Sequence, residues 1–327
     1  MRAWQVSALG QPAVCRDIAL PVPGPGEARL RIAACGLNFA DLLMQDGKYQ
    51  EHPALPYVPG MEFSGIVEAL GPGAPADAPA PGARVAAFAG SGGLAEAAVL
   101  PVARLVEIPA TMSLTEAAAF QIAYGTSHLA LAHRARLQPG ETLLVLGAAG
   151  GVGLTAVEIG RRLGARVIAC ARGAAKREVA LAAGADDFID SDTPDLKAAF
   201  KALGGVDVVY DPVGGAGFDA ALSACRPEGR LLAIGFASGA VPQVPANRLL
   251  VKNLSVIGLY WGGYLAFAPE VLTDSLRTLF GWYATGGLRP HVGHVLPFAR
   301  YPEGLALLRD RRATGKVVIT APEPGME

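Results

Sequence analysis

The chain has 327 residues, of which 51% are hydrophobic, so it is long enough to form two domains with separate cores. Its 28 basic and 29 acidic residues nearly balance, which argues against the basic surface that nucleic acids or anionic lipids require. Cys15, Cys35, Cys170 and Cys225 form no C-x-x-C pair, which indicates free thiols in a reducing compartment. The start lacks the pattern of a signal peptide and no apolar run approaches the ~20 residues of a membrane span, so we expect a cytoplasmic protein without a membrane partner.

The first part of the chain, to about Pro109, predicts a mainly β region. Alternating runs such as ARLRIAACGL and FSGIVEAL are separated by turn-forming stretches such as PVPGPGE and LPYVPG. At Ser113 the pattern changes, because Ser113 and Glu116 form a capping-box signature before a long helical run. Beyond it, apolar strands such as TLLVLG, ARVIACA and VDVVYD alternate with helical segments. This alternation predicts an α/β domain in which a doubly wound parallel sheet is covered by helices on both faces.

A glycine-rich turn follows the strand TLLVLG and leads directly into a helix. Its sequence, Gly147 to Gly153, matches A-x-G-x-x-G, with Ala148 in place of the usual first glycine. This strand-turn-helix context is typical of dinucleotide binding, since the backbone and the helix N-terminus can approach a pyrophosphate. The alternative is a turn that only packs. On the binding interpretation, the expected contacts come from Ala149, Gly150, Gly151 and Val152.

The next strand, ARVIACA, ends without the acidic residue that holds the ribose hydroxyls of NAD. Arg172 and Lys176 stand near that strand end instead, and basic side chains there can pair with the 2′-phosphate of NADPH. We therefore predict NADPH as the cofactor. The alternative for both residues is a solvated helix start.

The glycine turn, AACGLNFADLLMQDGKY, PYVPGMEFSGIVEALG, YDPVGG, GRLLAIGFASG and GKVVI together resemble the quinone oxidoreductase branch of the medium-chain dehydrogenase/reductase superfamily. The resemblance implies a GroES-like substrate-side domain from residues 1–117 and 259–327, and a Rossmann domain from residues 118–258. It also implies an active site between the two domains and a homodimer.

The resemblance bears on metal binding as well. Zinc-dependent relatives place a cysteine and a histidine on the catalytic metal in segments similar to GLNFAD and GMEFSG, where this chain has Asn38 and Met61. An amide and a thioether are poor zinc ligands, so we predict no metal.

The residues expected to act on substrate are Asn38 and Tyr49. Asn38 can donate from its amide to a substrate carbonyl or line the nicotinamide, or it can cap the following helix with Asp41 at the third position. Tyr49 can donate a proton or simply pack. The predicted substrate pocket consists of Asp41, Tyr49, Tyr260 and Trp261, although the last two can equally belong to a core or an interface.

Several further residues are expected at the cofactor. Val213, Gly235 and Phe236 follow strand ends, where ligands of doubly wound sheets bind. The resemblance assigns Thr126 to the nicotinamide end, although its hydroxyl can also bond within the helix. It places Ser191 where relatives often have a tyrosine at the adenine end, and it directs Lys316 toward the cofactor.

These observations predict an NADPH-dependent quinone oxidoreductase that transfers hydride without zinc to a small-molecule acceptor. Without a Lewis acid, catalysis depends on positioning the nicotinamide against an electron-poor carbon. One alternative is a reductase of activated C=C bonds in an enone, enal or acryloyl substrate. Another is a dinucleotide-binding sensor or binding protein with little turnover.

Overall fold

A computed structural model describes residues 1–322, which divide into two units. The terminal unit combines Met1–Ile122 with the chain from Pro290 onward, and the central unit is Ala123–Arg289. Among the described residues, no helix has the length and apolar character needed to cross a membrane.

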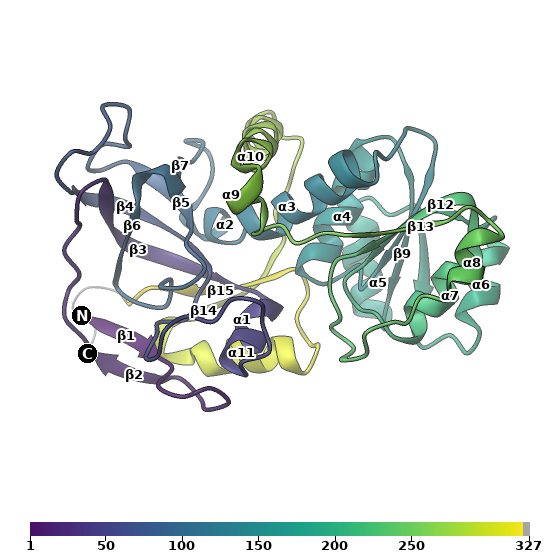
Figure 1. Ribbon diagram of the computed structural model, residues 1–327, viewed down its shortest axis with the longest axis horizontal. Helices are drawn as coiled ribbons and strands as arrows, with labels where there is room; N and C mark the ends of the chain where they lie inside the picture. Colours follow the sequence, from purple (N-terminus) through teal and green to yellow (C-terminus); the bar gives the residue numbers. More distant parts are fainter. Residues whose placement is uncertain (323–327) are drawn as a thin grey trace. The chain divides into compact units, whose positions relative to one another are not determined.

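The terminal unit is built around β3, Glu27–Leu37, which pairs antiparallel with β4, β6 and β15 (Figure 1). Its buried residues alternate at Ala28, Leu30 and Ile32, as expected for a strand with one face on a core. This confirms the predicted mainly β region. The remaining strands of the unit are β1 (Arg2–Gln5), β2 (Val14–Asp17), β4 (Glu62–Leu70), β5 (Arg84–Phe88), β6 (Ala97–Pro101), β7 (Leu105–Glu107), β14 (Val292–Pro297) and β15 (Lys316–Thr320).

The last strand, β15, brings a distant part of the chain to the middle of this sheet. Val317 pairs with Leu37 and Val318 with Gly36, so Lys316 lies at the end of β3. Gly36 permits the close packing of helix α2 on β3, because an added Cβ atom would clash with the carbonyl oxygen of Ala118. The helical segments of this unit are α1 (Phe39–Gln45), α2 (Leu114–Ala118), α11 (Tyr301–Arg309) and the short turns Val102–Arg104 and Phe298–Arg300.

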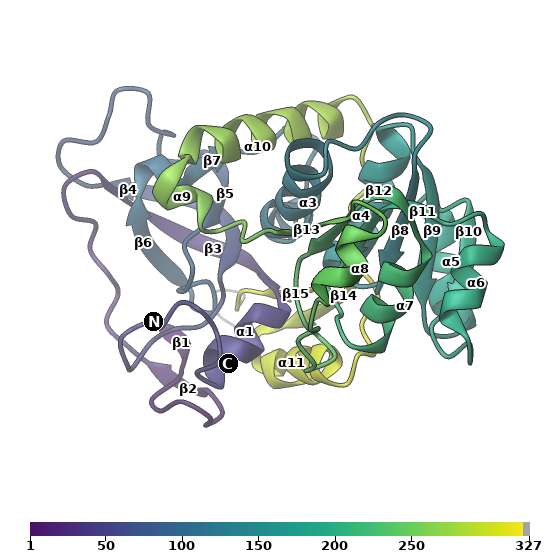
Figure 2. The same cartoon turned by 45° about the vertical axis from the view of Figure 1, so that its right-hand side comes forward.

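The central unit contains a six-stranded sheet in the order β10-β9-β8-β11-β12-β13, with every pair parallel. Figure 2 shows the strands fanning from β13 to β10, and α4 and α7 lie on opposite sides of the sheet. The predicted doubly wound α/β fold is thus confirmed. The strands are β8 (Thr142–Leu146), β9 (Arg166–Ala171), β10 (Asp187–Asp190), β11 (Val206–Asp211), β12 (Cys225–Ala233) and β13 (Ser255–Gly258).

The strand order reverses between β8 and β11, since the chain runs from β8 through β9 to β10 and then returns to the other side of β8. Ligands of such sheets bind at the carboxyl ends of the strands beside this reversal. The helices of this part of the chain are α3 (Gln121–His128, continuing as a π-helical turn Leu129–Arg134), α4 (Gly151–Arg162), α5 (Ala174–Ala182), α6 (Leu196–Ala202), α7 (Ala216–Ala224), α8 (Ala246–Leu250), α9 (Tyr264–Phe267) and α10 (Pro269–Ala284).

Residues 259–289 group with the central unit, whereas the sequence assigned them to the substrate-side domain. The Arg162 guanidinium lies 4.6 Å from the centre of the Trp282 ring, and the backbone N–H of Arg289 donates to Glu158. His128 and Ser275 share a 2.8 Å hydrogen bond. These side chains join α10 to α3 and α4, and helical periodicity alone does not reveal such partners.

Candidate functional site

The glycine turn after β8 has the conformation that its sequence suggests. Gly147 has φ +60°, a left-handed conformation that favours glycine, and its carbonyl accepts from the N–H of Gly150 at 2.9 Å. A Cβ atom at Gly153 would clash with that same carbonyl, so only glycine lets α4 approach β8 this closely. Ala148 is fully buried, and its N–H donates to the carbonyl of Cys170. The residue with the left-handed backbone is thus Gly147 and not Ala148. Position 148 does not require glycine, which explains why it can hold an alanine.

Helix α4 begins at this turn without a capping side chain. Its N-cap is Gly150, and no side-chain hydrogen bond from the described residues caps its first turn. The N–H groups of Gly151 and Val152 therefore remain as donors at the positive end of a helix of 12 residues. An uncapped helix N-terminus next to a tight glycine turn suits a pyrophosphate.

The loop after β11 lies directly beside the glycine turn. The Val213 side chain contacts the turn, because a Cβ atom on Gly147 would lie 2.9 Å from Val213 Cγ2. Asp211 organises this loop: its Oδ1 accepts from the N–H groups of Val213 at 2.7 Å and Gly214 at 2.9 Å. Burial raises the pKa of Asp211, while these two N–H donors act in the opposite direction. Asp211 is not among the predicted site residues, although an acid between a strand and a Gly-Gly turn is a visible signal in the sequence.

Val213 lies beside Gly147, and the Gly235 N–H donates to the Asp211 carbonyl at 3.3 Å, but the Val213 backbone is already engaged. Its N–H donates to Asp211, and its carbonyl accepts from Ser238 at 2.9 Å. Val213 can therefore contact a cofactor only through its side chain or through the second lone pair of its carbonyl oxygen. Phe236 follows Gly235 and is exposed.

The ends of β9 and β10 bring Arg172 and Ser191 side by side. The Ser191 N–H donates to the carbonyl of Ala171 at 2.9 Å, and Lys176 stands in the first turn of α5. Arg172 forms an ion pair, in which its Nε donates to Asp192 Oδ1 at 3.0 Å. The sequence interpretation did not include Asp192, which only the register of β10 against β9 brings to Arg172.

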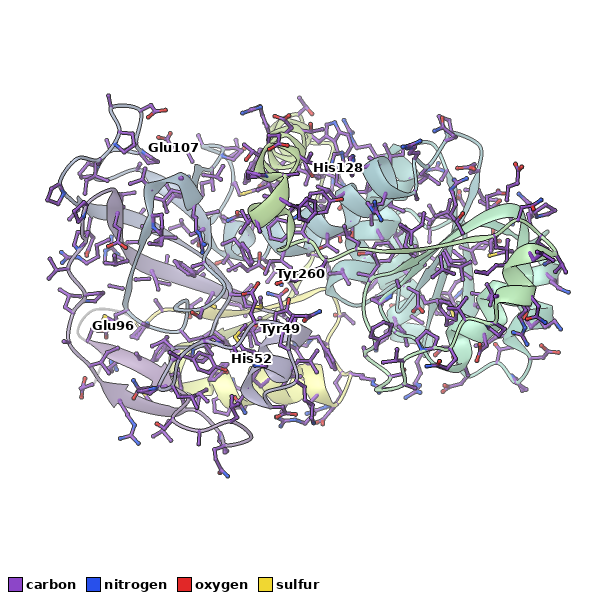
Figure 3. All side chains as sticks on the ribbon, in the orientation of Figure 1. Tyr49, His52, Glu96, Glu107, His128 and Tyr260 are labelled. Carbon is purple, nitrogen blue, oxygen red and sulfur yellow. The ribbon has the colours of Figure 1, made fainter. Side chains whose placement is uncertain are left out.

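Helix α3 carries Thr126 and is covered at the neighbouring Gly125 by the ring of Trp261. Thr126 is buried, and its neighbour Ser127 donates to the carbonyl of Val152 at 2.9 Å, which ties α3 to the first turn of α4. The Trp261 ring packs on the backbone of Gly125, where an added Cβ atom would lie 2.5 Å from Nε1. Trp261 is buried, whereas Tyr260 is partly exposed on the segment after β13 (Figure 3). The two aromatic residues thus have different environments, and Trp261 packs against α3.

In the terminal unit, Lys316 forms a buried hydrogen-bonded cluster. Its Nζ donates to Glu62 Oε1 at 2.7 Å, to Asn38 Oδ1 at 2.6 Å and to the carbonyl of Leu37 at 2.9 Å. The Lys316 and Glu62 side chains are only 6% and 1% exposed, so this is a buried ion pair. An ammonium has three donors, and these three acceptors use all of them. The geometry therefore assigns Lys316 to the interior of the terminal unit, in place of the cofactor contact that the sequence predicted.

Asn38 is held by the same cluster. Its Nδ2 donates to Glu62 Oε1 at 3.0 Å and to the carbonyl of Gly36 at 3.3 Å, so both amide N–H groups have internal partners. This corrects the expectation that Asn38 donates to a substrate carbonyl: its remaining hydrogen-bonding capacity is a lone pair on Oδ1. Glu62 was missed by sequence reasoning, although an acid within the apolar GMEFSG segment was a signal.

Asp41 supports Asn38 from the first turn of α1. The Asn38 N–H donates to Asp41 Oδ2 at 2.8 Å, and Asn38 has the extended backbone of an N-cap. The alternative interpretation of Asn38 as a helix cap is thus confirmed. Asp41 is 1% exposed, and burial raises its pKa to about 6. It was expected to line a substrate pocket, but its carboxylate faces the interior.

Tyr49 lies in the loop that follows α1 and is partly exposed; Figure 3 shows it near His52. Its role as a proton donor stays a prediction.

The donor set for a metal is weak at the positions that zinc would use. Met61 is buried, and the Asn38 amide is engaged as described above. Burial raises the pKa of the nearby Cys35 thiol well above its usual value, which opposes the thiolate form that binds zinc. Within residues 1–322, no group of three or more His, Cys, Asp or Glu side chains is arranged to hold a metal ion.

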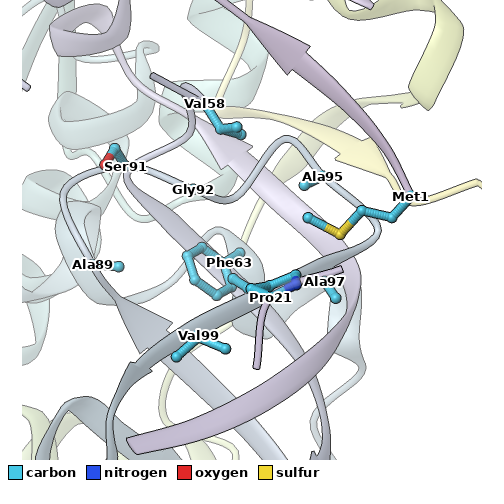
Figure 4. A pocket seen from close by; sticks show the side chains of 11 residues that line it. Met1, Pro21, Val58, Phe63, Ala89, Ser91, Gly92, Ala95, Ala97 and Val99 are labelled. Carbon is cyan, nitrogen blue, oxygen red and sulfur yellow. The ribbon is translucent and has the colours of Figure 1, made fainter. Parts of the chain in front are cut away.

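A separate apolar pocket of about 250 Å³ lies in the terminal unit (Figure 4). Phe63 forms one wall, whereas the preceding Glu62 points to the opposite side of β4, as alternation along a strand requires. None of the predicted site residues lines this pocket, whose other walls include Met1, Pro21, Val58, Ser91 and Ala97.

Comparisons with known proteins agree with both units. Residues 24–110 match the family model described as alcohol dehydrogenase GroES-like domain, and residues 151–278 match the one described as zinc-binding dehydrogenase. Quinone oxidoreductase-like protein 2 of Bos taurus is 40% identical over 323 residues, which cover 98% of this chain and 92% of the relative.

Two solved structures of bacterial quinone oxidoreductases are also similar. The Thermus thermophilus protein, solved alone and with NADPH, is 37% identical with a TM-score of 0.86, covering 98% of this chain and 100% of that one. The Escherichia coli protein, solved with NADPH, is 28% identical with a TM-score of 0.89 over the same shares of the two chains. The glycine turn, the sheet order and these matches together identify the family: the chain belongs to the quinone oxidoreductase-like branch of the medium-chain dehydrogenase/reductase superfamily.

Proposed function

We propose that this protein is an NADPH-dependent quinone oxidoreductase that transfers hydride without a catalytic zinc ion. The observation that carries the proposal is the glycine turn at Gly147–Gly153, followed by the uncapped N-terminus of α4. Arg172 at the neighbouring strand end supplies a positive charge for the 2′-phosphate. Relatives solved with NADPH support the choice of cofactor.

The proposed reaction takes a hydride and a proton to a quinone. NADPH gives two electrons with its hydride, one proton comes from solvent or a side chain, and the products are NADP⁺ and a hydroquinone. The chain's part is to bind and orient the dinucleotide. Gly151 and Val152 donate to its pyrophosphate, and Thr126 on α3 serves the nicotinamide end. In the terminal unit, Asn38 presents a fixed acceptor oxygen because Lys316 and Glu62 hold its amide.

The absence of zinc is part of the proposal and rests on the residues at the two ligand positions. Asn38 and Met61 offer an amide and a thioether, which zinc binds poorly beside thiolate and imidazole. Metal analysis of the purified protein is expected to find no stoichiometric zinc. Activity that is lost with a chelator and restored by zinc would contradict this.

The decisive experiment is a panel of acceptors in which NADPH oxidation is followed by absorbance. Quinones are expected to support turnover faster than enones, enals or acryloyl compounds. Turnover with activated alkenes alone would favour the C=C reductase, and tight NADPH binding without turnover would favour a sensor or binding protein. The proposed partner is a small-molecule electron acceptor. We propose that the protein reduces it in the cytoplasm.

A further inference from the structure

The ion pair between Arg172 and Asp192 lies where a dinucleotide with a 2′-phosphate would place that group. Arg172 follows β9, and Asp192 follows β10, the strand paired to β9 at the sheet edge. Their side chains are 65% and 61% exposed, so both are accessible to a ligand in solution. The 3.0 Å contact uses the Arg172 Nε donor. One residue thus offers the charge that NADPH needs, and its neighbour partly neutralises that charge.

The backbone holds Asp192 in this position. The Asp192 N–H donates to Asp190 Oδ1 at 3.0 Å, and Asp190 Oδ2 accepts from the N–H of Gly173 at 3.0 Å. These two bonds lower the pKa of Asp190, so it is ionised at neutral pH. Asp190 therefore bridges the segment that carries Asp192 to the residue next to Arg172. The position of the Asp192 carboxylate follows from the paired strands.

The balance of charge at this edge distinguishes the two dinucleotides. Arg172 and Lys176 contribute two positive charges, and Asp190 and Asp192 contribute two negative charges, so the formal sum is zero. A 2′-phosphate carries nearly two negative charges and must approach Arg172 against the Asp192 carboxylate. NADH has a neutral hydroxyl at the same position. The carboxylate therefore opposes NADPH much more strongly than NADH.

We propose that Asp192 is a specificity-determining residue, which lowers the preference for NADPH and allows NADH to be used as well. Its carboxylate pairs with Arg172, and a 2′-phosphate must displace or share that pair. The inference rests on the dinucleotide site of the proposed function. It does not depend on which acceptor is reduced.

The test is the affinity of Asp192→Asn for each dinucleotide, measured by fluorescence titration at low and high salt. We expect NADPH to bind about two- to fivefold more tightly than to the wild type at low salt, the range of an exposed ion pair, and NADH to be nearly unaffected. High salt should reduce the difference, because exposed charges are screened.

A matched control removes the same charge elsewhere in the central unit. Asp274 pairs with Arg277 at 2.6 Å on α10, and both side chains are well exposed. Asp274→Asn is expected to leave the ratio of NADPH to NADH affinity unchanged. In an Arg172→Ala background, Asp192→Asn should increase the NADPH affinity much less, because no Arg172 guanidinium is present to be freed from the ion pair.

Three results would overturn the inference. The affinity ratio of Asp192→Asn could equal that of Asp274→Asn, NADPH could bind more weakly to Asp192→Asn because the carboxylate orients Arg172 for the phosphate, or the wild type could fail to bind NADH. Each leaves the proposed quinone reductase standing if the wild type still oxidises NADPH with quinones. Conversely, a shifted affinity ratio without quinone turnover would refute the proposed function alone. A wild-type chain that binds neither dinucleotide would refute both.

Discussion

Asp41 has a carboxylate that is buried beside the backbone N–H of Asn38. Burial is the largest influence on its pKa, which rises from 3.8 to about 6. The folded state therefore binds this proton more tightly than the unfolded state does. Its contribution to stability is fully present below about pH 4 and is lost as the pH rises through 6.

Asp41→Asn is expected to remove this pH-dependent decrease in the free energy of unfolding, because an amide does not ionise. Relative to the wild type, the variant should gain stability as the pH rises from 4 to 7, by at most about 3 kcal/mol for two pKa units. Denaturant unfolding of both proteins at pH 5 and pH 8 measures the difference. A constant difference at the two pH values would show that Asp41 does not titrate in this range.

Lys316 and Glu62 form a buried pair in which each charge depends on the other. Lys316→Met should destabilise the protein by about 3–5 kcal/mol, because it leaves the Glu62 carboxylate buried without its cation. Adding Glu62→Gln should recover part of that loss. Equilibrium unfolding measures both effects, and a double variant less stable than the single one would contradict this account.

At the scale of residues, the sequence identified chemistry better than it identified partners. The sequence predicts Asn38 and Lys316 as site residues, but 278 positions separate them, and only the pairing of β15 with β3 joins them. The bond from the Asn38 amide to Glu62 also joins two different strand segments, 24 positions apart. Side-chain partners of this kind follow from strand register, which local patterns do not determine.

The join between β8 and α4 shows at the scale of elements how one glycine sets a packing distance. Gly153→Ala should force α4 away from β8, because the new Cβ atom would clash with the Gly147 carbonyl. We expect a loss of stability and at least a tenfold loss of dinucleotide affinity, about 1.4 kcal/mol or more. Thermal unfolding and NADPH titration measure the two effects.

Gly281→Ala is the matched control, since Gly281 lies within α10 and an added Cβ atom there meets nothing within 4 Å. Helix propensity alone should stabilise it by up to about 1 kcal/mol. The dinucleotide affinity should not change. If both variants changed equally in stability and in dinucleotide affinity, the backbone would have to shift at little cost to relieve the clash at Gly153.

Element type was well predicted where periodicity was clear. TLLVLG forms β8 and VDVVYD forms β11. Right-handed strand-helix-strand connections account for helices on both faces of the sheet, whereas the strand order comes from the structure. The sequence places α10 in the substrate-side domain, whereas the structure groups it with the central unit. Its contacts through Trp282 and Ser275 are made with residues more than a hundred positions earlier.

For the whole molecule, the edge strand β13 suggests how two copies associate. Among the described strands its only neighbour in the sheet is β12, and the preceding segment exposes Leu250 at 77% and Val251 at 73%. An unpaired edge beside exposed apolar side chains favours association with another chain. We predict a homodimer that buries this surface, as the family resemblance also implies.

Light scattering after size exclusion should give the mass of two chains for the wild type. The double change Leu250→Lys and Val251→Lys should shift the mass toward one chain, because two like charges would face their copies. Leu20→Lys changes an exposed residue of the terminal unit and serves as the control. A dimer unaffected by the double change would place the interface elsewhere.

The pairing of β15 with β3 has a consequence for biosynthesis. The ribosome has synthesised the whole central unit when it reaches Arg289, but the terminal unit still lacks β15 with Lys316 at that point. During that interval Glu62 and Asn38 have been synthesised without the cation that joins them. The first-made part of the nascent chain is thus expected to become protease-resistant last, after the central unit has folded.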